Sequence, residues 1–354
     1  MISGYYGFGN TGDEAVLAGM LATFREIGLE AEITVLSANP ERTRAEHPGV
    51  ESVHRYRIPD LIRVMKRADL VISGGGSLLQ DVTSAISPRY YLFVLQLAHL
   101  LRRKTMVYAQ GVGPLIRSST RRAVARTLNR VQLISVRDSD SKALLESIGV
   151  NRPPIHVTAD PSFAMQPDLE SADRILAANG VAGSELIGVS LRNWPSHVAS
   201  VVKAGEAIAD AADELGVELL YIPMQEPEDL YPSPSVCKHK LHSVVKDVGG
   251  PRIAKGMISR CGLMVGMRLH SLIFAASEGV PFVPVVYDPK VASFAALAGQ
   301  PSGADIEALD PGALRDAVIA SWRNRAELAA ALRAKSAELR EAALESGRMA
   351  RGLL

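Results

Sequence analysis

Residues 1–26, MISGYYGFGNTGDEAVLAGMLATFRE, indicate how this chain folds. A short apolar run leads into a loop that contains Gly7, Gly9 and Gly12, and a helical stretch follows from about Asp13 to Glu26. A strand that passes through a glycine-rich turn into a helix is the first half of a βαβ unit. The segment therefore predicts an α/β protein with a glycine loop after its first strand.

Short apolar runs and helical stretches keep alternating after this segment. Alternating strands and helices predict parallel sheets that are covered by helices on both faces. Further helices are expected near Ile58–Arg67, Arg89–Leu101, from Ser119, near Ser139–Ile148 and near Val198–Leu215.

The pattern weakens between Pro161 and Pro167 and resumes with ELIGVSLRNW at residues 185–194. We therefore place a domain boundary near residue 165, which divides the chain into domains of residues 1–165 and 166–354. The length of 354 residues fits two domains at about 150 residues each. Two doubly wound domains that face each other would gather the carboxyl ends of both sheets around one cleft, where open α/β sheets bind ligands.

Charge and cysteine content disfavour several classes of protein. The chain has 39 Lys and Arg against 38 Asp and Glu, a net charge of +1, which argues against nucleic-acid binding. Cys237 and Cys261 are too few for a disulfide framework and lack the spacing of a metal site. The first residues do not resemble a secretion signal, and no apolar run reaches the length of about 18 residues that a membrane span needs. We therefore expect a cytoplasmic protein.

One basic tract departs from the even balance of charge. Eight basic residues and no acid lie between Arg102 and Arg130, several of them in RSSTRRAVARTLNR at residues 117–130. Such a tract is typical of a solvated helix face, and it also suits docking to anionic lipid headgroups.

The opening glycines resemble a dinucleotide-binding loop. That loop needs an acid about 20 residues further on to bind a ribose hydroxyl, but the next apolar run ends with Ser37 and Asn39. Asp13 and Glu14 would also place negative charge where a pyrophosphate binds. These observations disfavour a nicotinamide cofactor. The two acids either complement the dipole of the first helix or hydrogen-bond a polyol and accept a hydroxyl proton.

Glycines also follow later expected strands. In SGGGSLLQD, residues 73–81, the triplet Gly74, Gly75 and Gly76 either lets a ligand approach closely or forms a tight turn without a ligand. Gln110 lies at a strand end before two further glycines, and the same alternatives hold for it.

Basic side chains follow several expected strands. Arg137 comes directly after the apolar run LIS, and Arg89 lies near an expected helix start; each is either an ion-pair partner or a contact for a carboxylate or phosphate. In GMRLHSLIF, Arg268 and His270 come straight after the apolar run GLMV, and Lys290 follows the next strand. Because histidine transfers protons near neutral pH, this group indicates a site for an anionic small molecule.

Seven blocks of sequence, read together, closely resemble the polysaccharide pyruvyl transferase family. They are, in chain order, SGYYGFGNTGDEAVL, ISGGGSLLQDVTS, YAQGVGPL, SVRDSDS, VTADPSF, MRLHSLIFAASEGVPFV and YDPKV. The resemblance extends from about residue 2 to about residue 297 and is nearest to the bacterial cell-surface-anchoring type. It implies a GT-B fold, the two-domain fold of B-type glycosyltransferases, in which two Rossmann-like domains face each other across a cleft. Within residues 226–251 only PEDL resembles the family, which leaves the acceptor preference open.

The resemblance implies transfer of the enolpyruvyl unit of phosphoenolpyruvate onto two hydroxyls of one sugar, typically O4 and O6 of N-acetylmannosamine. The products are a cyclic ketal and phosphate, and neither a metal nor a nucleotide cofactor is implied. The acceptor resembles N-acetylmannosamine joined to N-acetylglucosamine on undecaprenyl diphosphate, and the ketal serves secondary cell-wall polysaccharide that anchors surface-layer proteins. A lipid-linked acceptor would bring the protein to anionic lipid of the inner leaflet. The docking residues expected for this are Arg117, Arg121, Arg122 and Arg126.

The resemblance also implies roles for individual residues. His270 is expected to be the general acid that protonates the methylene carbon of the donor. Asp13 or Glu14 is expected to be the base or a ligand of a sugar hydroxyl, on an acceptor side formed by the first domain. Residues expected to bind the donor's carboxylate and phosphate are Arg137, Arg268 and Lys290. The remaining expected substrate contacts are Asn10, Arg89, Gly74, Gly75, Gly76 and Gln110.

Three other functions are alternatives. A GT-B glycosyltransferase would use a nucleotide sugar, but the second half offers no clear acidic pair for a donor ribose. A sugar-binding relative without activity is disfavoured because Arg268, His270 and Lys290 are all present. A nicotinamide oxidoreductase lacks its ribose-binding acid, and the absence of HExxH, GxSxG, CxxC and GxxxxGK[ST] disfavours metal, acyl-transfer and ATPase chemistry. The sequence leaves open whether the chain forms homo-oligomers.

Overall fold

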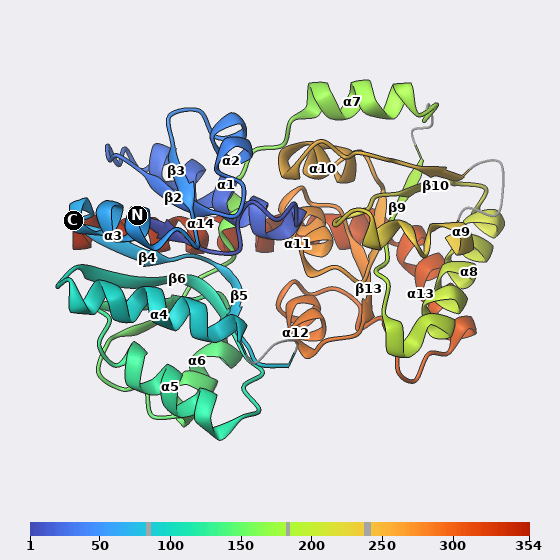
Figure 1. Cartoon of the computed structure of the whole chain (residues 1–354). Helices are drawn as coiled ribbons and strands as arrows, with labels where there is room; N and C mark the ends of the chain where they lie inside the picture. The colour runs from blue at the N-terminus through green and yellow to red at the C-terminus, as the bar shows by residue number, and fades with distance from the viewer. Residues whose placement is uncertain (83–85, 182–184, 237–241) are drawn as a thin grey trace. The chain divides into compact units, whose positions relative to one another are not determined.

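The computed structural model of the chain describes residues 1–82, 86–181, 185–236 and 242–354 (Figure 1). Thr83 and Ser84 of the motif ISGGGSLLQDVTS, and residues 237–241 of the segment 226–251, lie outside the described residues. The chain forms two compact units, which we call the N-terminal unit (Met1–Met165 with Leu339–Leu354) and the C-terminal unit (Gln166–Glu338).

The N-terminal unit is built on one parallel sheet. Its strands lie in the order β3, β2, β1, β4, β6, β7, β8, and β5 pairs with β6. The strands are β1 (Ile2–Ser3), β2 (Thr34–Ser37), β3 (Glu51–His54), β4 (Leu70–Ser73), β5 (Gly76–Leu79), β6 (Lys104–Val112), β7 (Leu133–Val136) and β8 (Ile155–Val157). Because β1 lies between β2 and β4, the strand order reverses beside it, as in a Rossmann-like sheet.

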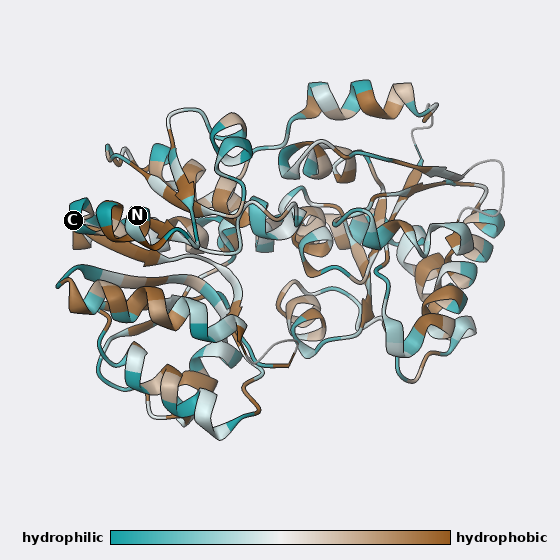
Figure 2. Cartoon of the chain, viewed as in Figure 1, coloured by the Kyte–Doolittle hydropathy of each residue, from teal (hydrophilic) through white to brown (hydrophobic). Residues whose placement is uncertain are grey.

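Helices cover both faces of this sheet (Figure 1). Ile72 and Met106 pack with α1 on one face, whereas Val71 packs with α3 and α4 and Val107 with α4, α5 and α6. Successive strand residues point to opposite faces, so the nearly continuous apolar strands, brown in Figure 2, fit a sheet that is buried on both sides. The helices are α1 (Thr11–Glu26), α2 (Pro40–Glu46), α3 (Ile58–Arg67), α4 (Ser87–Leu100), α5 (Ser118–Leu128) and α6 (Ser139–Ser147).

The last helix, α14 (Arg325–Leu353), starts in the C-terminal unit and ends in the N-terminal unit. Residues 339–354, which the sequence analysis placed in the second domain, therefore pack in the first. Ala350 is 1% exposed and belongs to the same apolar core as α1. The Ser346 hydroxyl lies 3.0 Å from that of Ser135 and 2.9 Å from that of Thr158. A helical pattern identifies an apolar face but not the surface that covers it, which is why the sequence did not assign this segment correctly.

The C-terminal unit is a second parallel α/β arrangement. Its strands lie in the order β11, β10, β9, β12, β13, β14. They are β9 (Leu186–Ser190), β10 (Glu218–Tyr221), β11 (His242–Val244), β12 (Leu263–Gly266), β13 (Phe282–Val286) and β14 (Ala304–Asp305). The helices of this unit are α7 (Leu169–Ala178), α8 (Val198–Leu215), α9 (Ser233–Val236), α10 (Pro251–Ile258), α11 (Leu269–Ser277), α12 (Pro289–Leu297), α13 (Pro311–Arg323) and the start of α14. The predicted class, α/β with two Rossmann-like domains, is confirmed.

Helices at Ile58–Arg67 and Val198–Leu215 have the predicted bounds. Strand β5 is not predicted, because its apolar residues Leu78 and Leu79 are too few to give a strand pattern. It begins at the last glycine of the triplet and pairs with β6, where Gly76 lies opposite Gln110. This extra strand brings the glycine triplet next to the end of β6.

Candidate functional site

The loop after β1 leads into a helix that is capped by Asn10. Its side-chain Oδ1 accepts hydrogen bonds from the backbone N–H groups of Gly12 and Asp13, at 3.0 and 3.2 Å. Asn10 is therefore the N-cap, and α1 begins at Thr11, two residues before the predicted start. Asp13 and Glu14 lie in the first turn, where negative charge complements the helix dipole, but neither of them caps the helix.

Glu14 is buried, with 2% of its surface exposed. Its Oε1 accepts a hydrogen bond of 2.8 Å from the backbone N–H of Gly7, and its buried Oε2 accepts none from the described residues. Burial raises the pKa of Glu14 to about 7, against the opposing effect of the Gly7 hydrogen bond, because desolvation disfavours the charged carboxylate. Glu14 thus ties the glycine loop to α1 and titrates near neutral pH.

Protein side chains fill the space beside the first two glycines of the triplet after β4. A Cβ on Gly74 would lie 2.3 Å from the Tyr6 hydroxyl, and a Cβ on Gly75 would lie 2.7 Å from Val16 Cγ1. Gly74 and Gly75 therefore let this loop pack against the connection between β1 and α1. The triplet thus makes a tight, protein-packed connection from β4 into β5.

Asp13 lies beside the third glycine of the triplet. Gly76 has a φ of +88°, which favours glycine, and a Cβ there would lie 2.8 Å from Asp13 Oδ1. Asp13 is partly exposed, whereas Glu14 is buried. Of the two acids, Asp13 is the one that a substrate can reach from solvent.

Arg137 follows β7 and is 7% exposed. Its Nη1 donates to Asp160 Oδ2 at 2.9 Å and its Nη2 donates to Ser77 Oγ at 3.1 Å. The guanidinium lies against Gly111, where a Cβ would be 2.8 Å from its Nε. The guanidinium of Arg137 therefore connects β5 to the segment after β8, and most of its donors have protein partners.

Gln110 and Arg89 occupy different environments. Gln110 is fully buried, and its Nε2 donates to the carbonyl oxygen of Gly74 at 2.8 Å and to the hydroxyl of Ser73 at 3.3 Å. It therefore holds the glycine loop in place from β6. Arg89 is exposed in the first turn of α4. The described contacts do not bring it together with Gln110 or Arg137.

In the C-terminal unit, Arg268 forms a buried ion pair with Asp229. Arg268 follows β12, and its Nε and Nη2 donate to the two carboxylate oxygens of Asp229 at 2.9 and 2.5 Å. Asp229 is fully buried and also accepts hydrogen bonds from the backbone N–H groups of Met224 and Gln225, at 3.2 and 3.0 Å. A bidentate pair of this kind fixes the guanidinium and offsets its charge.

His270 and Lys290 begin two neighbouring helices of the same unit. His270 lies in the first turn of α11, partly exposed, with its ring centroid 6.3 Å from that of Phe274. Lys290 lies in the first turn of α12, with its Nζ 3.0 Å from Asp288 Oδ2 and its side chain 32% exposed. Because β12 and β13 are paired in parallel, both helices start at the carboxyl edge of one sheet, where ligands of such sheets bind.

Sequence reasoning missed the two acids that hold the arginines. Asp160 and Asp229 lie 23 and 39 residues from Arg137 and Arg268, too far for any local pattern to connect them. A signal was present, because VTADPSF contains Asp160 and PEDL contains Asp229. Both blocks were noted as family-like without a role for their acids.

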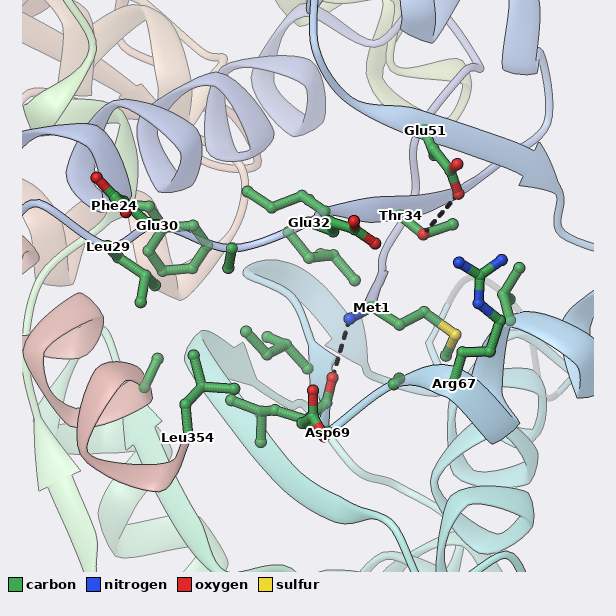
Figure 3. A pocket seen from close by; sticks show the side chains of 18 residues that line it. Met1, Phe24, Leu29, Glu30, Glu32, Thr34, Glu51, Arg67, Asp69 and Leu354 are labelled. Atoms are coloured by element: carbon green, nitrogen blue, oxygen red, sulfur yellow. Dashed lines mark hydrogen bonds between the residues drawn. The ribbon is translucent and has the colours of Figure 1, made fainter.

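A cavity of about 380 Å³ in the N-terminal unit lies away from these residues. Figure 3 shows it beside Met1, Thr34 and Asp69, at the amino ends of β1, β2 and β4. In this view the Met1 amine points to the carbonyl oxygen of Leu70 at 2.9 Å. Ligands of parallel sheets bind at the opposite, carboxyl edge, so we do not assign this cavity to the candidate site.

Membrane-spanning helices and metal-binding groups are both absent from the described residues. None of their helices is long and apolar enough to cross a membrane. None of their His, Cys, Asp and Glu side chains forms a group of three or more that could hold a metal ion.

The overall structure is similar to solved proteins with the GT-B fold. Anabaena Alr3699/HepE in complex with UDP-glucose has a TM-score of 0.65 at 14% identity, over 100% of this chain and 99% of that one. UDP-GlcNAc 2-epimerase from Neisseria meningitidis, bound to UDP-GlcNAc, has a TM-score of 0.62 at 14% identity, over 99% and 98%. At this identity the likeness establishes the fold class alone.

The sequence comparison defines the family. Residues 10–289 match the profile of the polysaccharide pyruvyl transferases, and the chain belongs to this family. A relative is the amylovoran biosynthesis protein AmsJ of Erwinia amylovora, 20% identical over 89% of each chain. The chain is thus a pyruvyltransferase that acts in polysaccharide biosynthesis, and the family resemblance drawn from its sequence is confirmed.

Proposed function

We propose that this pyruvyltransferase moves the enolpyruvyl group of phosphoenolpyruvate onto a lipid-linked cell-wall sugar and forms a cyclic ketal. The proposed acceptor is N-acetylmannosamine, at O4 and O6, joined to N-acetylglucosamine on undecaprenyl diphosphate, and the proposed product is a precursor of secondary cell-wall polysaccharide. The observation that carries the proposal is the family match over residues 10–289. This range contains every candidate residue named above except Lys290, which directly follows it.

The proposed reaction needs one proton donor and one proton acceptor. Protonation of the donor's methylene carbon makes a methyl group and leaves an electron-poor C2, to which the first sugar hydroxyl adds as it loses its proton. The second hydroxyl then displaces phosphate, which leaves with the electron pair of its C–O bond, and the proton of that hydroxyl passes to the base or to the phosphate. Phosphoenolpyruvate and a diol thereby give a pyruvate ketal and inorganic phosphate, without a metal or a nucleotide.

His270 is the proposed general acid, because it is partly exposed at the carboxyl edge of the C-terminal sheet. Asp13 is the proposed base, because it is the partly exposed acid of the pair. Glu14 is buried, and its Oε1 already accepts the Gly7 N–H. We therefore assign Glu14 as a positioning residue that holds the loop before α1.

The proposed donor carries a carboxylate and a phosphate, which basic side chains would stabilise as charge moves onto the leaving phosphate. Lys290 is partly exposed and can contact an anion directly. Arg137 and Arg268 are engaged by Asp160 and Asp229, so we propose that they act through their remaining donors and by orienting the loops around them. Asn10, Gln110 and the glycine triplet shape the acceptor side by the packing described above.

The proposal is tested by incubating the protein with phosphoenolpyruvate and a synthetic lipid-diphosphate N-acetylmannosaminyl-N-acetylglucosamine. Inorganic phosphate is measured together with the mass of the glycan, which should rise by that of a pyruvate ketal. We expect both signals to require the acceptor. We expect His270→Gln to lose at least a hundredfold in rate, in line with the effect of about 10² to 10⁴ of a general acid.

The matched control is His156→Gln, which changes an exposed histidine on β8 of the other unit and should keep the wild-type rate. If the folded wild type forms no ketal from phosphoenolpyruvate with this acceptor or with other diols, the proposed donor is wrong. If a different sugar is modified, the donor stands and the proposed acceptor is wrong.

A lipid-linked acceptor also suggests docking to the inner face of the membrane through the basic tract around α5. Arg122 and Arg126 are exposed and lie four residues apart on one helix face, and the nearby Ile116 is 65% exposed. Arg117 and Arg121 are also exposed, although they donate to Asp81 and to the carbonyl oxygen of Leu115. Exposed cations near an apolar side chain suit an anionic membrane surface.

Liposome co-sedimentation tests this docking. We expect binding to vesicles with anionic lipid, loss of binding at high salt, and weaker binding of Arg122→Gln/Arg126→Gln. The control Arg63→Gln/Arg67→Gln removes the same charge from exposed positions of α3 and should bind like the wild type. Equal sedimentation with vesicles that contain anionic lipid and with vesicles that lack it would contradict this docking.

A further inference from the structure

Arg192 packs against two aromatic rings at the carboxyl end of β9. Its guanidinium carbon lies 4.9 Å from the ring centroid of Trp194 and 4.9 Å from that of Tyr287. The two rings contact each other edge to face, with centroids 5.1 Å apart. Stacking of this kind orients a guanidinium and leaves its edge free to donate hydrogen bonds.

Two hydrogen-bond donors of this cluster have no acceptor among the described residues. Arg192 Nε and Trp194 Nε1 are both buried atoms, and neither donates to a described residue. Leaving a buried N–H unsatisfied is unfavourable, so two such groups in one cluster indicate an acceptor from outside the described residues, such as a bound molecule. Because Arg192 and Trp194 are partly exposed as whole residues, an incoming molecule can reach the edge of the cluster.

The cluster lies on the same sheet edge as the residues proposed to act on the donor. Ser190, the last residue of β9, pairs with Gly266, the last residue of β12. Arg192 and Arg268 each follow two residues later, so they emerge from adjacent strands. Tyr287 directly follows β13, the strand on the other side of β12. The position is therefore within the ligand-binding edge of the C-terminal sheet.

Arg192 differs from Arg137 and Arg268, the two arginines expected to bind the donor's carboxylate and phosphate. Arg137 donates to Asp160, and Arg268 forms a bidentate pair with Asp229. Among the described residues, Arg192 packs against the two rings and has no carboxylate at ion-pair distance, and its charge acts on Asp229 only at longer range. Of these three arginines, Arg192 is the one whose guanidinium is available to a ligand.

We infer that Arg192 and Trp194 form an oxyanion-binding subsite that binds the carboxylate or the phosphate of the donor. Arg192 and Trp194 offer hydrogen-bond donors only, so they suit an anion, and the planar guanidinium matches two oxygens of either group. Trp194 adds one further N–H donor. The identity of the donor rests on the proposed function, whereas the anion-binding role rests on the stacked and unpaired side chains.

Tryptophan fluorescence tests the subsite without turnover. The chain has 2 Trp residues, so a Trp322→Phe background leaves Trp194 as the sole reporter. Its emission is followed during titration with phosphoenolpyruvate, inorganic phosphate, pyruvate or UDP. We expect a saturable change with phosphoenolpyruvate, and Arg192→Gln, which removes the charge but keeps a planar amide, should weaken its affinity at least tenfold. In turnover, Arg192→Gln should raise KM for phosphoenolpyruvate at least tenfold and change kcat less.

The matched control is Arg325→Ala. Arg325 also stacks on a tryptophan, Trp322, at 4.2 Å, but it donates to the Trp322 carbonyl oxygen and to Glu185. The Arg325→Ala variant should leave KM for phosphoenolpyruvate unchanged.

The fluorescence titrations also show which group of the donor is bound. A response of Trp194 to phosphate but not to pyruvate assigns the subsite to the donor's phosphate, and the reverse assigns it to the carboxylate.

The outcomes separate this inference from the proposed function. If Trp194 responds to UDP alone and no ketal forms, the subsite binds anions but the proposed donor is wrong. If ketal forms while Trp194 does not respond to phosphoenolpyruvate, or while folded Arg192→Gln keeps the wild-type KM, the inference is overturned. Near-ultraviolet circular dichroism verifies that each variant is folded.

Discussion

Replacing Glu14 with glutamine should make the protein less sensitive to alkaline pH. The pKa of this buried carboxyl is raised from 4.5 to about 7 by desolvation. Below pH 4.5 the carboxyl is protonated in both the folded and the unfolded chain, so its ionisation costs nothing. Between pH 4.5 and 7 the unfolded chain loses the proton first, and stability falls as pH rises. The shift corresponds to about 3 kcal/mol of lost stability above pH 7.

Glutamine in place of Glu14 removes this loss, and its side-chain carbonyl still accepts the Gly7 N–H. The difference in unfolding free energy between Glu14→Gln and the wild type should therefore move in favour of the variant by about 2 kcal/mol between pH 5 and pH 8. Urea unfolding measured at both values, on the transition of the N-terminal unit, gives this difference. Glu30→Gln, at an exposed position, is the control and should show a much smaller change.

A difference in unfolding free energy that does not depend on pH would refute the raised pKa of Glu14.

Glu14→Gln, compared with Asp13→Asn, also tests which of the two acids is the base. Asp13→Asn should lower kcat by about 10² to 10⁴, the usual contribution of a general base, whereas Glu14→Gln should stay within tenfold of the wild type. If a folded Glu14→Gln is inactive and Asp13→Asn is active, the assignment of the base to Asp13 is wrong.

Three further predictions concern stability. Asp229→Asn leaves the mostly buried Arg268 without its counter-ion and should cost about 3–5 kcal/mol, whereas Asp173→Asn, in an exposed pair with Arg260, should have a far smaller effect; equal losses in urea unfolding would contradict this contrast. Gly74→Ala would force a Cβ against the Tyr6 hydroxyl and should cost about 1–3 kcal/mol, while Gly352→Ala in α14 meets open space and should not destabilise. Ser346→Ala removes hydrogen bonds to Ser135 and Thr158 and should lower the thermal stability of the N-terminal unit by about 1 kcal/mol, unlike exposed Ser118→Ala; a wild-type melting temperature would show that these contacts contribute nothing.

Much of the fold could be predicted because the strands and helices have clear local signals. Apolar runs of four or five residues mark β4, β9 and β12, and helix-favouring stretches mark α3 and α8 with the observed bounds. The failures depend on contacts between distant segments. Strand β5 exists because Gly76 pairs with Gln110, and the placement of residues 339–354 depends on a core that Ala350 shares with α1. Neither contact leaves a periodic signal in the sequence.

The candidate site was predictable in its positions but less so in its pairings. Residues that directly follow apolar strands, such as Arg137 and Arg268, do lie at the carboxyl edges of the sheets. The partners Asp160 and Asp229 were not identified, because a guanidinium can pair with any nearby carboxylate and burial decides which one. Arg192 carries the same signal as Arg137, an arginine just after an apolar strand, and this rule applied to every strand would have found it.

The course of α14 makes the C-terminal unit an insertion within the sequence of the N-terminal unit. During synthesis the first 165 residues leave the ribosome well before residues 339–353, which complete their core. Until then the apolar surface around α1 that Ala350 later covers stays open to solvent. The nascent first unit is therefore expected to need protection from aggregation, which a holding chaperone can supply. It reaches its final stability only after the second unit has been made.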